Sequence, residues 1–192
     1  MATVSVGRFF SLLYSDYLAF YHFREESPQH LRWLAVPRIL TNPSMHAVLL
    51  IRIACASPNA LNFVWRNILI TKHSIDIGLK PTIGPGLMLS HPFGIVLGGG
   101  SLGENVLLSH NVTIGSARTP RRGEEVAFPA IGDRVIVNPN SVVAGGVQIG
   151  SDSVIGANCV VDCDMPPNSV YSRGEVRLRS RPADPDAIFR SA

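Results

Sequence analysis

The sequence predicts a left-handed parallel β-helix that follows an N-terminal α-helical segment. Thirteen aliphatic residues fall on a six-residue grid after residue 74, and helical patterns of apolar residues fill much of the chain before it. We therefore divide the 192 residues into a helical region at 1–73, the β-helix at 74–170 and a C-terminal tail at 171–192. This length suits one domain with a helical extension.

The six-residue spacing is the main evidence for the β-helix. An α-helix repeats every 3.6 residues and a strand every 2, so neither explains the spacing. In a three-sided parallel β-helix, each six residues supply one short strand and one corner, with the aliphatic side chain inside. A β-sandwich would instead show alternation and hairpin turns. The grid consists of Ile77, Ile83, Leu89 and Ile95, then after a slip of one residue Leu102, Leu108 and Ile114, and after a gap Ile131, Val137, Val143, Ile149, Ile155 and Val161.

The gap in the grid is a polar segment at 116–127, between Ile114 and Ile131. Because it places no aliphatic residue on the grid until its end, it predicts a loop that extends from one corner. Loops on a rigid scaffold often carry functional residues, so this segment is a candidate for a role in binding.

Three stretches before residue 74 show helical periodicity. Val6–Phe23 has aromatic and leucine side chains at three- and four-residue intervals, which form one apolar face. Pro43–Ala56 follows Asn42, a favourable N-cap residue, and Asn59–Ile70 follows a Ser-Pro break. Helices this short bury little surface alone, so we expect them to pack against another part of the protein.

Composition narrows the functional classes. The net charge is +3, and the basic residues cluster only at Arg118–Arg122 and Arg173–Arg181, without the interleaved aromatics of nucleic-acid binding. Cys55, Cys159 and Cys163 have no metal-type spacing, which indicates reduced thiols. We find no signal peptide and no membrane span in the sequence, so we expect a cytoplasmic protein that binds neither nucleic acid nor membranes.

Two of the six histidines lie on the predicted β-helix. His91 and His110 each follow a serine and stand two residues after a grid residue, which places them at corners rather than in the core. The other four, His22, His30, His46 and His73, lie in or beside the helical region, where a structural or surface role is expected. From the residues alone, a catalytic and a structural role for His91 both remain open.

Two features of the sequence accompany His91. Asp76 lies fifteen residues earlier, just before a grid isoleucine, so its carboxylate could meet His91 at neighbouring corners of adjacent coils. A carboxylate on one imidazole nitrogen fixes the tautomer and leaves the other nitrogen basic. Downstream, three consecutive glycines at 98–100 expose backbone N–H groups and let a ligand approach closely.

Together these motifs resemble the hexapeptide-repeat acyltransferases, and specifically their serine acetyltransferase branch. The resemblance spans about 42–170 and rests on the segments at 45–53, 75–77, 91–96, 111–115, 155–161 and 166–170. It implies acetyl-CoA as co-substrate and a homotrimer built through the β-helix, with active sites between subunits. Many family members also pair two trimers through their N-terminal helices, so a dimer of trimers is an alternative.

The resemblance also implies roles for individual residues. His91 matches the catalytic histidine and Asp76 its orienting aspartate, in a direct transfer from acetyl-CoA to an acceptor hydroxyl that needs no metal. Backbone N–H groups near Gly98–Gly100 would stabilise the oxyanion. The positions expected to hold acetyl-CoA are Gly98, Gly99, Gly115, Ser116, Pro139 and Val154. Arg118 is expected to reach a CoA phosphate, with a solvated basic loop as the alternative.

The acceptor site departs from the family pattern. Serine acetyltransferases hold the amino acid with an Asp before the catalytic His and an Arg-His pair before a Pro. Here these positions are Ser90 and Ala127-Phe128, which lack the charges that a serine zwitterion requires. Phe128 offers an apolar wall that suits a sugar ring or a larger hydrophobic acceptor. We therefore expect a small-molecule acceptor other than free serine, a saccharide or biosynthetic intermediate, contacted by Ser90, Ala127, Phe128 and His110.

Three other functions compete with this one. Serine O-acetylation with a rearranged acceptor site is the alternative within the same enzyme class. A non-catalytic β-helical scaffold would need neither Asp76 nor His91. A γ-class carbonic anhydrase would need three metal-binding histidines on neighbouring coils, and only His91 and His110 lie on the β-helix.

Overall fold

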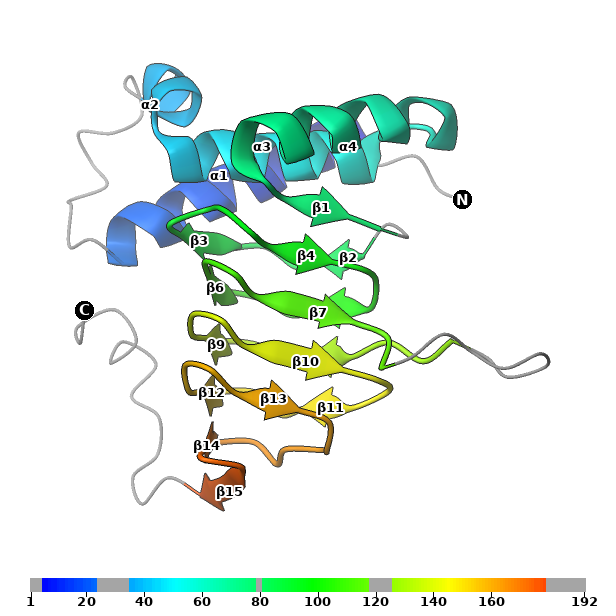
Figure 1. The fold of residues 1–192 in the computed structure, drawn as a ribbon. Helices are drawn as coiled ribbons and strands as arrows, with labels where there is room; N and C mark the ends of the chain where they lie inside the picture. The colour runs from blue at the N-terminus through cyan, green and yellow to red at the C-terminus, as the bar shows by residue number, and fades with distance from the viewer. Residues whose placement is uncertain (1–4, 24–34, 79–80, 118–125, 179–192) are drawn as a thin grey trace.

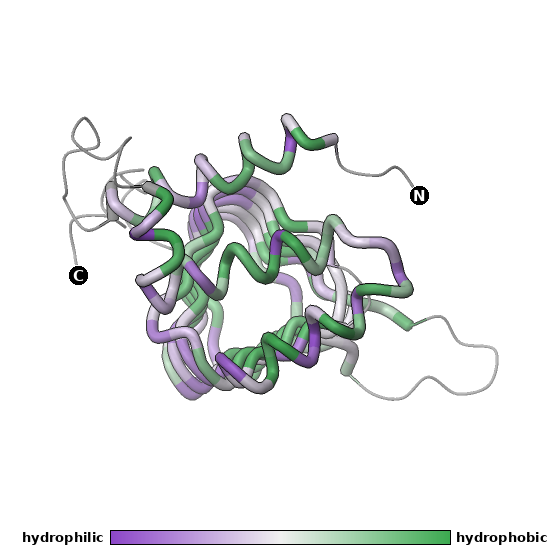
Figure 2. The backbone as a smooth tube through the Cα atoms, turned by 90° about the horizontal axis from the view of Figure 1, so that it is seen from above, coloured by the Kyte–Doolittle hydropathy of each residue, from purple (hydrophilic) through white to green (hydrophobic). Residues whose placement is uncertain are grey.

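Helices lie across one end of a stack of short parallel strands (Figures 1 and 2). The computed structural model describes residues 5–23, 35–78, 81–117 and 126–178. Its helices are α1 (Val6–Phe23), α2 (Ala35–Thr41), α3 (Pro43–Ala56) and α4 (Asn59–His73). The predicted helices correspond to α1, α3 and α4, and α2 was not predicted. None of the helices in these ranges is both long and apolar enough to cross a membrane.

The strands form three flat faces, which confirms the predicted parallel β-helix. Face A is β1 (Asp76–Ile77), β4 (Val96–Leu97), β7 (Thr113–Gly115), β10 (Val142–Ala144) and β13 (Val160–Val161). Face B is β2 (Thr82–Ile83), β5 (Ser101–Leu102), β8 (Ala130–Ile131) and β11 (Gln148–Ile149). Face C is β3 (Met88–Ser90), β6 (Leu107–Ser109), β9 (Ile136–Val137), β12 (Val154–Ile155), β14 (Ser169–Ser172) and β15 (Glu175–Leu178). The chain visits faces A, B and C in turn, and the five strands of face A mark five coils.

All thirteen predicted grid residues are buried, and twelve of them form the in-register columns inside the prism. Leu89, Leu108 and Val137, for example, are in register on successive coils of face C and are buried. Ile95 is buried as predicted but is out of register, because the residue paired with Ile77 on face A is Leu97. The corner before β4 therefore holds two more residues than a regular six-residue step, and this longer corner contains His91.

The corner between faces C and A, which we call the C/A corner, is built on residues with positive φ. Asn111, Asn140 and Asn158 occupy the same corner position on successive coils, with φ of 55°, 60° and 57°. Their side-chain amides form a ladder, in which Asn111 Nδ2 donates to Asn140 Oδ1 at 3.0 Å and Asn140 Nδ2 donates to Asn158 Oδ1 at 3.1 Å. Asparagine tolerates this backbone conformation better than most residues, so the ladder repeats the corner geometry along the prism.

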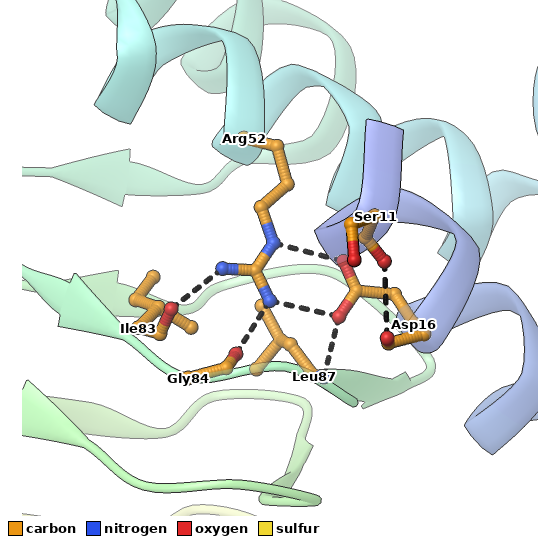
Figure 3. A network of polar contacts seen from close by, with 7 residues as sticks. Ser11, Asp16, Arg52, Ile83, Gly84 and Leu87 are labelled. Carbon is orange, nitrogen blue, oxygen red and sulfur yellow. Dashed lines mark hydrogen bonds and ion pairs between the residues drawn. The ribbon is translucent and has the colours of Figure 1, made fainter. Parts of the chain in front are cut away.

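A buried ion pair fixes the helices to the first coil (Figure 3). Arg52 of α3 donates from Nε and Nη2 to the Asp16 carboxylate of α1, each at 2.8 Å. The same guanidinium donates to the carbonyl groups of Ile83 and Gly84, and Asp16 accepts the Leu87 N–H at 2.8 Å. Asp16 is fully buried and Arg52 is 4% exposed. A buried ion pair whose charged groups are hydrogen-bonded in this way specifies how α1 and α3 are oriented on the first coil.

Apolar packing completes the attachment of the helices. Buried residues of α3 and α4, among them Ile51 and Leu69, join the interior of the β-helix in one continuous core. Ala19 of α1 packs on Met88 and Leu107, which point outward from face C. The far end of the prism departs from the predicted division of the chain, because β14 extends past residue 170 and pairs antiparallel with β15. The rest of the predicted tail, 179–192, lies outside the described residues.

Candidate active site

His91 lies in the longer corner between β3 and β4, in a backbone conformation that holds its side chain at the surface. Its φ is 54°, and the side chain is exposed. The Phe93 N–H donates to the His91 carbonyl at 2.8 Å, and the Asn111 N–H on the next coil donates to the Phe93 carbonyl at 3.0 Å. Gly94 follows with φ of 67°, and a Cβ there would lie 2.0 Å from Asn111 Oδ1. The same left-handed conformation recurs at other corners of this β-helix, for example at Asn105, Arg134 and Asp152, so it belongs to the corner geometry.

Three aromatic rings gather at this corner. The His110 ring stacks on Phe93, with centroids 5.2 Å apart and an angle of 11° between the planes. The His91 ring meets His110 edge to face, with centroids 6.0 Å apart. Phe93 is 51% exposed. The two β-helix histidines, predicted to lie at corners, thus form one cluster with an aromatic residue that the sequence analysis did not select.

Asp76 begins β1 at the same side of the prism, and its carboxylate is bound by a helix rather than by His91. Arg66 of α4 donates from Nε to Oδ1 and from Nη2 to Oδ2, the second at 2.8 Å. This bond holds the pKa of the Asp76 carboxyl below its usual range. Within the described residues, no hydrogen bond joins Asp76 to His91. The expected contact between them is therefore not formed in this structure.

The three glycines lie at the other end of β4, at the corner between faces A and B, which we call the A/B corner. Phe128 packs closely against this corner, because a Cβ on Gly99 would lie 2.8 Å from its ring. The two described ends of the 116–128 segment lie here as well: Ala127 faces Gly146 on the next coil. The Gly98 N–H donates to the Ile114 carbonyl at 2.8 Å. The strand ladder therefore occupies this N–H, which is one of the Gly98–Gly100 backbone groups that were expected to stabilise the oxyanion.

The predicted site residues divide between the two corners. The first group lies at or beside the C/A corner and consists of Asp76, Ser90, His91, His110 and Pro139, with Val154 on the adjacent face C. The second group lies at the A/B corner and consists of Gly98, Gly99, Gly115, Ser116, Ala127 and Phe128. Face A separates the two groups within one chain. Arg118 lies outside the described residues.

Two residues that contact the C/A corner residues were not predicted from the sequence. Phe93 falls in the His-Pro-Phe-Gly segment, where the failure of the six-residue grid at Ile95 was the available signal. Arg66 lies in α4, and no sequence pattern links it to Asp76, because the contact depends on how the helix packs on β1. Among the described residues, no group of three or more histidine, cysteine or acidic side chains is placed to hold a metal ion.

Comparisons with known proteins agree with this architecture. The family model "Bacterial transferase hexapeptide (six repeats)" matches residues 129–163. A serine acetyltransferase of Helicobacter pylori is 34% identical over 138 residues, which cover 68% of this chain and 78% of that protein. The galactoside O-acetyltransferase of Escherichia coli is 40% identical over 77 residues, or 36% of this chain and 38% of that protein.

A solved structure extends the similarity to nearly the whole chain. The crystal structure of Neisseria gonorrhoeae serine acetyltransferase superposes with a TM-score of 0.76 at 27% identity, covering 93% of this chain and 70% of that one. This agreement supports the left-handed β-helix, and it includes the N-terminal helices. The similar proteins are enzymes, which disfavours the alternative of a non-catalytic scaffold. The chain therefore belongs to the hexapeptide-repeat acyltransferases, in their serine acetyltransferase branch.

Proposed function

We propose that the protein is an acetyl-CoA-dependent O-acetyltransferase whose active site forms between two copies of the chain. The observation that carries this proposal is the division of the candidate residues between two corners separated by face A. If the C/A corner of one copy meets the A/B corner of another, His91 comes to face the Gly115 and Phe128 side of its neighbour. A closed ring of three copies satisfies every such contact, as is usual for cyclic homo-oligomers.

In this site His91 acts as the general base. Its imidazole takes the proton of the acceptor hydroxyl as the hydroxyl oxygen bonds to the thioester carbon of acetyl-CoA. The tetrahedral intermediate then collapses, the carbon–sulfur bond breaks, and the proton on His91 passes to the departing CoA sulfur. The products are the acetylated acceptor and free CoA, so the histidine returns to its starting state without a covalent enzyme intermediate.

Asp76 is proposed to orient His91 during this cycle. An ionised carboxylate has about four lone-pair sites, and Arg66 occupies two of them. The remaining sites can accept an imidazole N–H when substrate draws His91 inward. Arg66 keeps Asp76 ionised, because it lowers the pKa of that carboxyl. A charged carboxylate is the form that stabilises the imidazolium as His91 takes up its proton.

Acetyl-CoA is proposed to lie along the A/B corner. Gly115 has open space around it, since a Cβ there would meet no atom within 4 Å. Gly98, Gly99 and Ser116 line the same corner, and Pro139 and Val154 would contact the cofactor from the neighbouring copy. A surface of glycines suits a ligand held through backbone groups at close approach.

Serine is the acceptor that the relatives favour. The Helicobacter pylori protein that covers two thirds of this chain is a serine acetyltransferase, and the superposed Neisseria gonorrhoeae structure is another. This similarity outweighs the sequence-based expectation of an acceptor other than serine. L-serine is therefore the first acceptor in the proposed function.

A saccharide hydroxyl is the second candidate. Phe93 exposes half of its ring beside His91, and Ser90 provides a hydroxyl rather than a carboxylate at the same corner. An exposed aromatic face next to neutral hydrogen-bonding groups is a common platform for a sugar ring. The shorter match to galactoside O-acetyltransferase supports the same class.

Two measurements test the proposal. Release of CoA from acetyl-CoA is followed with L-serine and, separately, with a panel of mono- and disaccharides; saturable turnover with L-serine alone supports the first candidate, and turnover with sugars alone supports the second. No turnover with either class would contradict both acceptors.

The shared site is tested by co-expressing two inactive variants, His91→Asn and Gly115→Leu. Random mixing in a shared-site trimer leaves about a quarter of the sites with both native corners, so activity returns to about that fraction. If each chain carried a complete site, the mixture would stay inactive.

A further inference from the structure

His110 is a second imidazole beside the proposed base, and the direct-transfer mechanism gives it no task. Strand register pairs Ser90 with Ser109, so His110 stands one coil along from His91 at the C/A corner. Its ring is held on one side by Phe93, at 5.2 Å and 11°, and contacts His91 edge to face at 6.0 Å. The ring therefore packs against Phe93 and lies next to the proposed base.

The surroundings of His110 select one tautomer. Its Nδ1 atom is buried and, within the described residues, has no hydrogen-bond partner. A proton on Nδ1 would bury an unpaired N–H donor, which proteins avoid more strictly than an unpaired acceptor. The proton of the neutral ring therefore belongs on Nε2, which is not enclosed in this way. His110 thus presents an N–H donor from a rigid ring.

We infer that His110 is a catalytic residue whose Nε2–H donates a hydrogen bond to the thioester carbonyl oxygen as that oxygen becomes negatively charged. This inference rests on the proposed acetyl transfer. His91 takes the hydroxyl proton, while His110 keeps its own proton throughout, so no additional reactant is required. The two imidazoles then have separate tasks: one moves a proton, and the other stabilises charge.

The geometry of the corner fits this division. A tetrahedral centre places two oxygens close together, and each forms an N···O contact of about 2.7–3.1 Å, so two nitrogens about 5–6 Å apart can serve both. Ring centroids 6.0 Å apart allow such a spacing. The Gly98 N–H, one of the backbone donors at Gly98–Gly100 first expected for this task, is occupied by the Ile114 carbonyl. His110 offers a side-chain donor next to the base, at the corner where the acceptor hydroxyl is activated.

The kinetic test compares His110→Ala, His110→Gln and the control Tyr14→Phe, an exposed tyrosine on α1. Removing one oxyanion donor costs about 10²–10³ in kcat, so His110→Ala is expected to lose that much with a KM within threefold of wild type. Glutamine carries an N–H at a similar reach, so His110→Gln should recover at least tenfold over alanine and keep the wild-type pH profile of kcat/KM. The inference would be overturned if kcat of His110→Ala lay within threefold of wild type. It would also be overturned if His110→Gln were as impaired as His110→Ala and its pH profile of kcat/KM were flattened.

A spectroscopic test does not depend on the folding of any substituted chain or on catalysis. In ¹⁵N-labelled wild-type protein above pH 8, the long-range ¹H–¹⁵N pattern of His110 should show the proton on Nε2. A proton on Nδ1 would refute the assigned donor. If wild-type protein acetylates no acceptor, the proposed function fails while this tautomer measurement still reports on His110; if wild type is active and His110→Ala is equally active, only the inference about His110 fails.

Discussion

Arg66 donates from two nitrogens of its guanidinium to the two carboxylate oxygens of Asp76, which joins α4 to the first strand of the β-helix. The bond lowers the pKa of the Asp76 carboxyl. The residue expected to orient His91 is thus held by the helical region, so the position of α4 bears on the chemistry of the C/A corner. Both side chains are partly exposed, so the bond itself adds only about 0–1 kcal/mol to stability.

Replacing Arg66 by glutamine is expected to raise the pKa of Asp76 toward its ordinary value, because the bond that favours the carboxylate is lost. Since the native folded pKa is depressed, the stability that Asp76 contributes is present above the unfolded pKa of about 3.9 and is lost as pH falls through the folded pKa. The variant should show less of this acid-induced loss. The side-chain carboxyl ¹³C shift of Asp76, titrated by NMR, checks the pKa. Lys72→Gln on the same helix is the matched control, and equal titration curves for wild type and Arg66→Gln would contradict the prediction.

Replacing His91 by asparagine is expected to lower kcat by about 10²–10⁴, the usual contribution of a general base. Asparagine tolerates the positive φ of this corner, so the fold should stay intact. Steady-state kinetics at saturating acetyl-CoA measure the loss, and an unchanged melting curve verifies the fold. Retention of wild-type kcat in a folded variant would remove His91 from the mechanism.

Breaking the Asp16–Arg52 pair from one side is expected to destabilise the protein by about 3–5 kcal/mol, because it leaves a buried charge without its partner. Removing both side chains should cost less than the sum of the single changes, with a coupling of about 0.5–3 kcal/mol. Urea unfolding of Asp16→Ala, Arg52→Ala and the double variant measures these terms. Strict additivity would show that the two side chains do not stabilise one another.

Gly94→Ala is expected to destabilise the longer corner by more than about 1 kcal/mol, since alanine is strained at a φ of 67° and its Cβ would overlap Asn111 Oδ1. Because the same corner holds His91 and Phe93, activity should fall as well. Gly7→Ala in α1 is the control: its Cβ would meet nothing within 4 Å, and alanine there is favourable by about 0.5–1 kcal/mol. Equal stability changes for the two variants, measured by urea unfolding, would contradict the role given to Gly94.

The helical region should lose stability on mild acidification. His46 Nδ1 and His73 Nε2 lie 2.8 Å apart between α3 and α4, and the pKa of His73 is lowered, chiefly by burial and further by the charges of His46 and Lys72. The unfolded chain therefore binds more protons than the folded one between the folded pKa and about 6.5, so stability rises with pH up to that value and is flat above it. Urea unfolding at pH 5.5 and 7.5 measures the difference, which His73→Gln should reduce. An equal slope in that variant would exclude His73 as the source.

The repeat determined most of the fold by itself. Twelve of the thirteen predicted grid residues line the interior in register, because one aliphatic residue per strand and one turn per corner leave few other arrangements for these segments. The exception, Ile95, marks the corner that carries His91. The sequence shows that the six-residue period changes near this corner. It does not show how the two extra residues of the corner fold.

The site required the tertiary structure. His91 and His110 were found from the sequence because they recur at one position of the repeat, and register then places them on neighbouring coils. Arg66, Phe93 and the separation of the two corners were not accessible in this way. Arg66 contacts a strand from an α-helix, and Phe93 contacts His110 on the next coil. The two corners lie at opposite ends of the strands of face A. Local periodicity fixes which side of a strand faces inward, whereas contacts between distant elements depend on how those elements pack, and packing alone decided what surrounds His91.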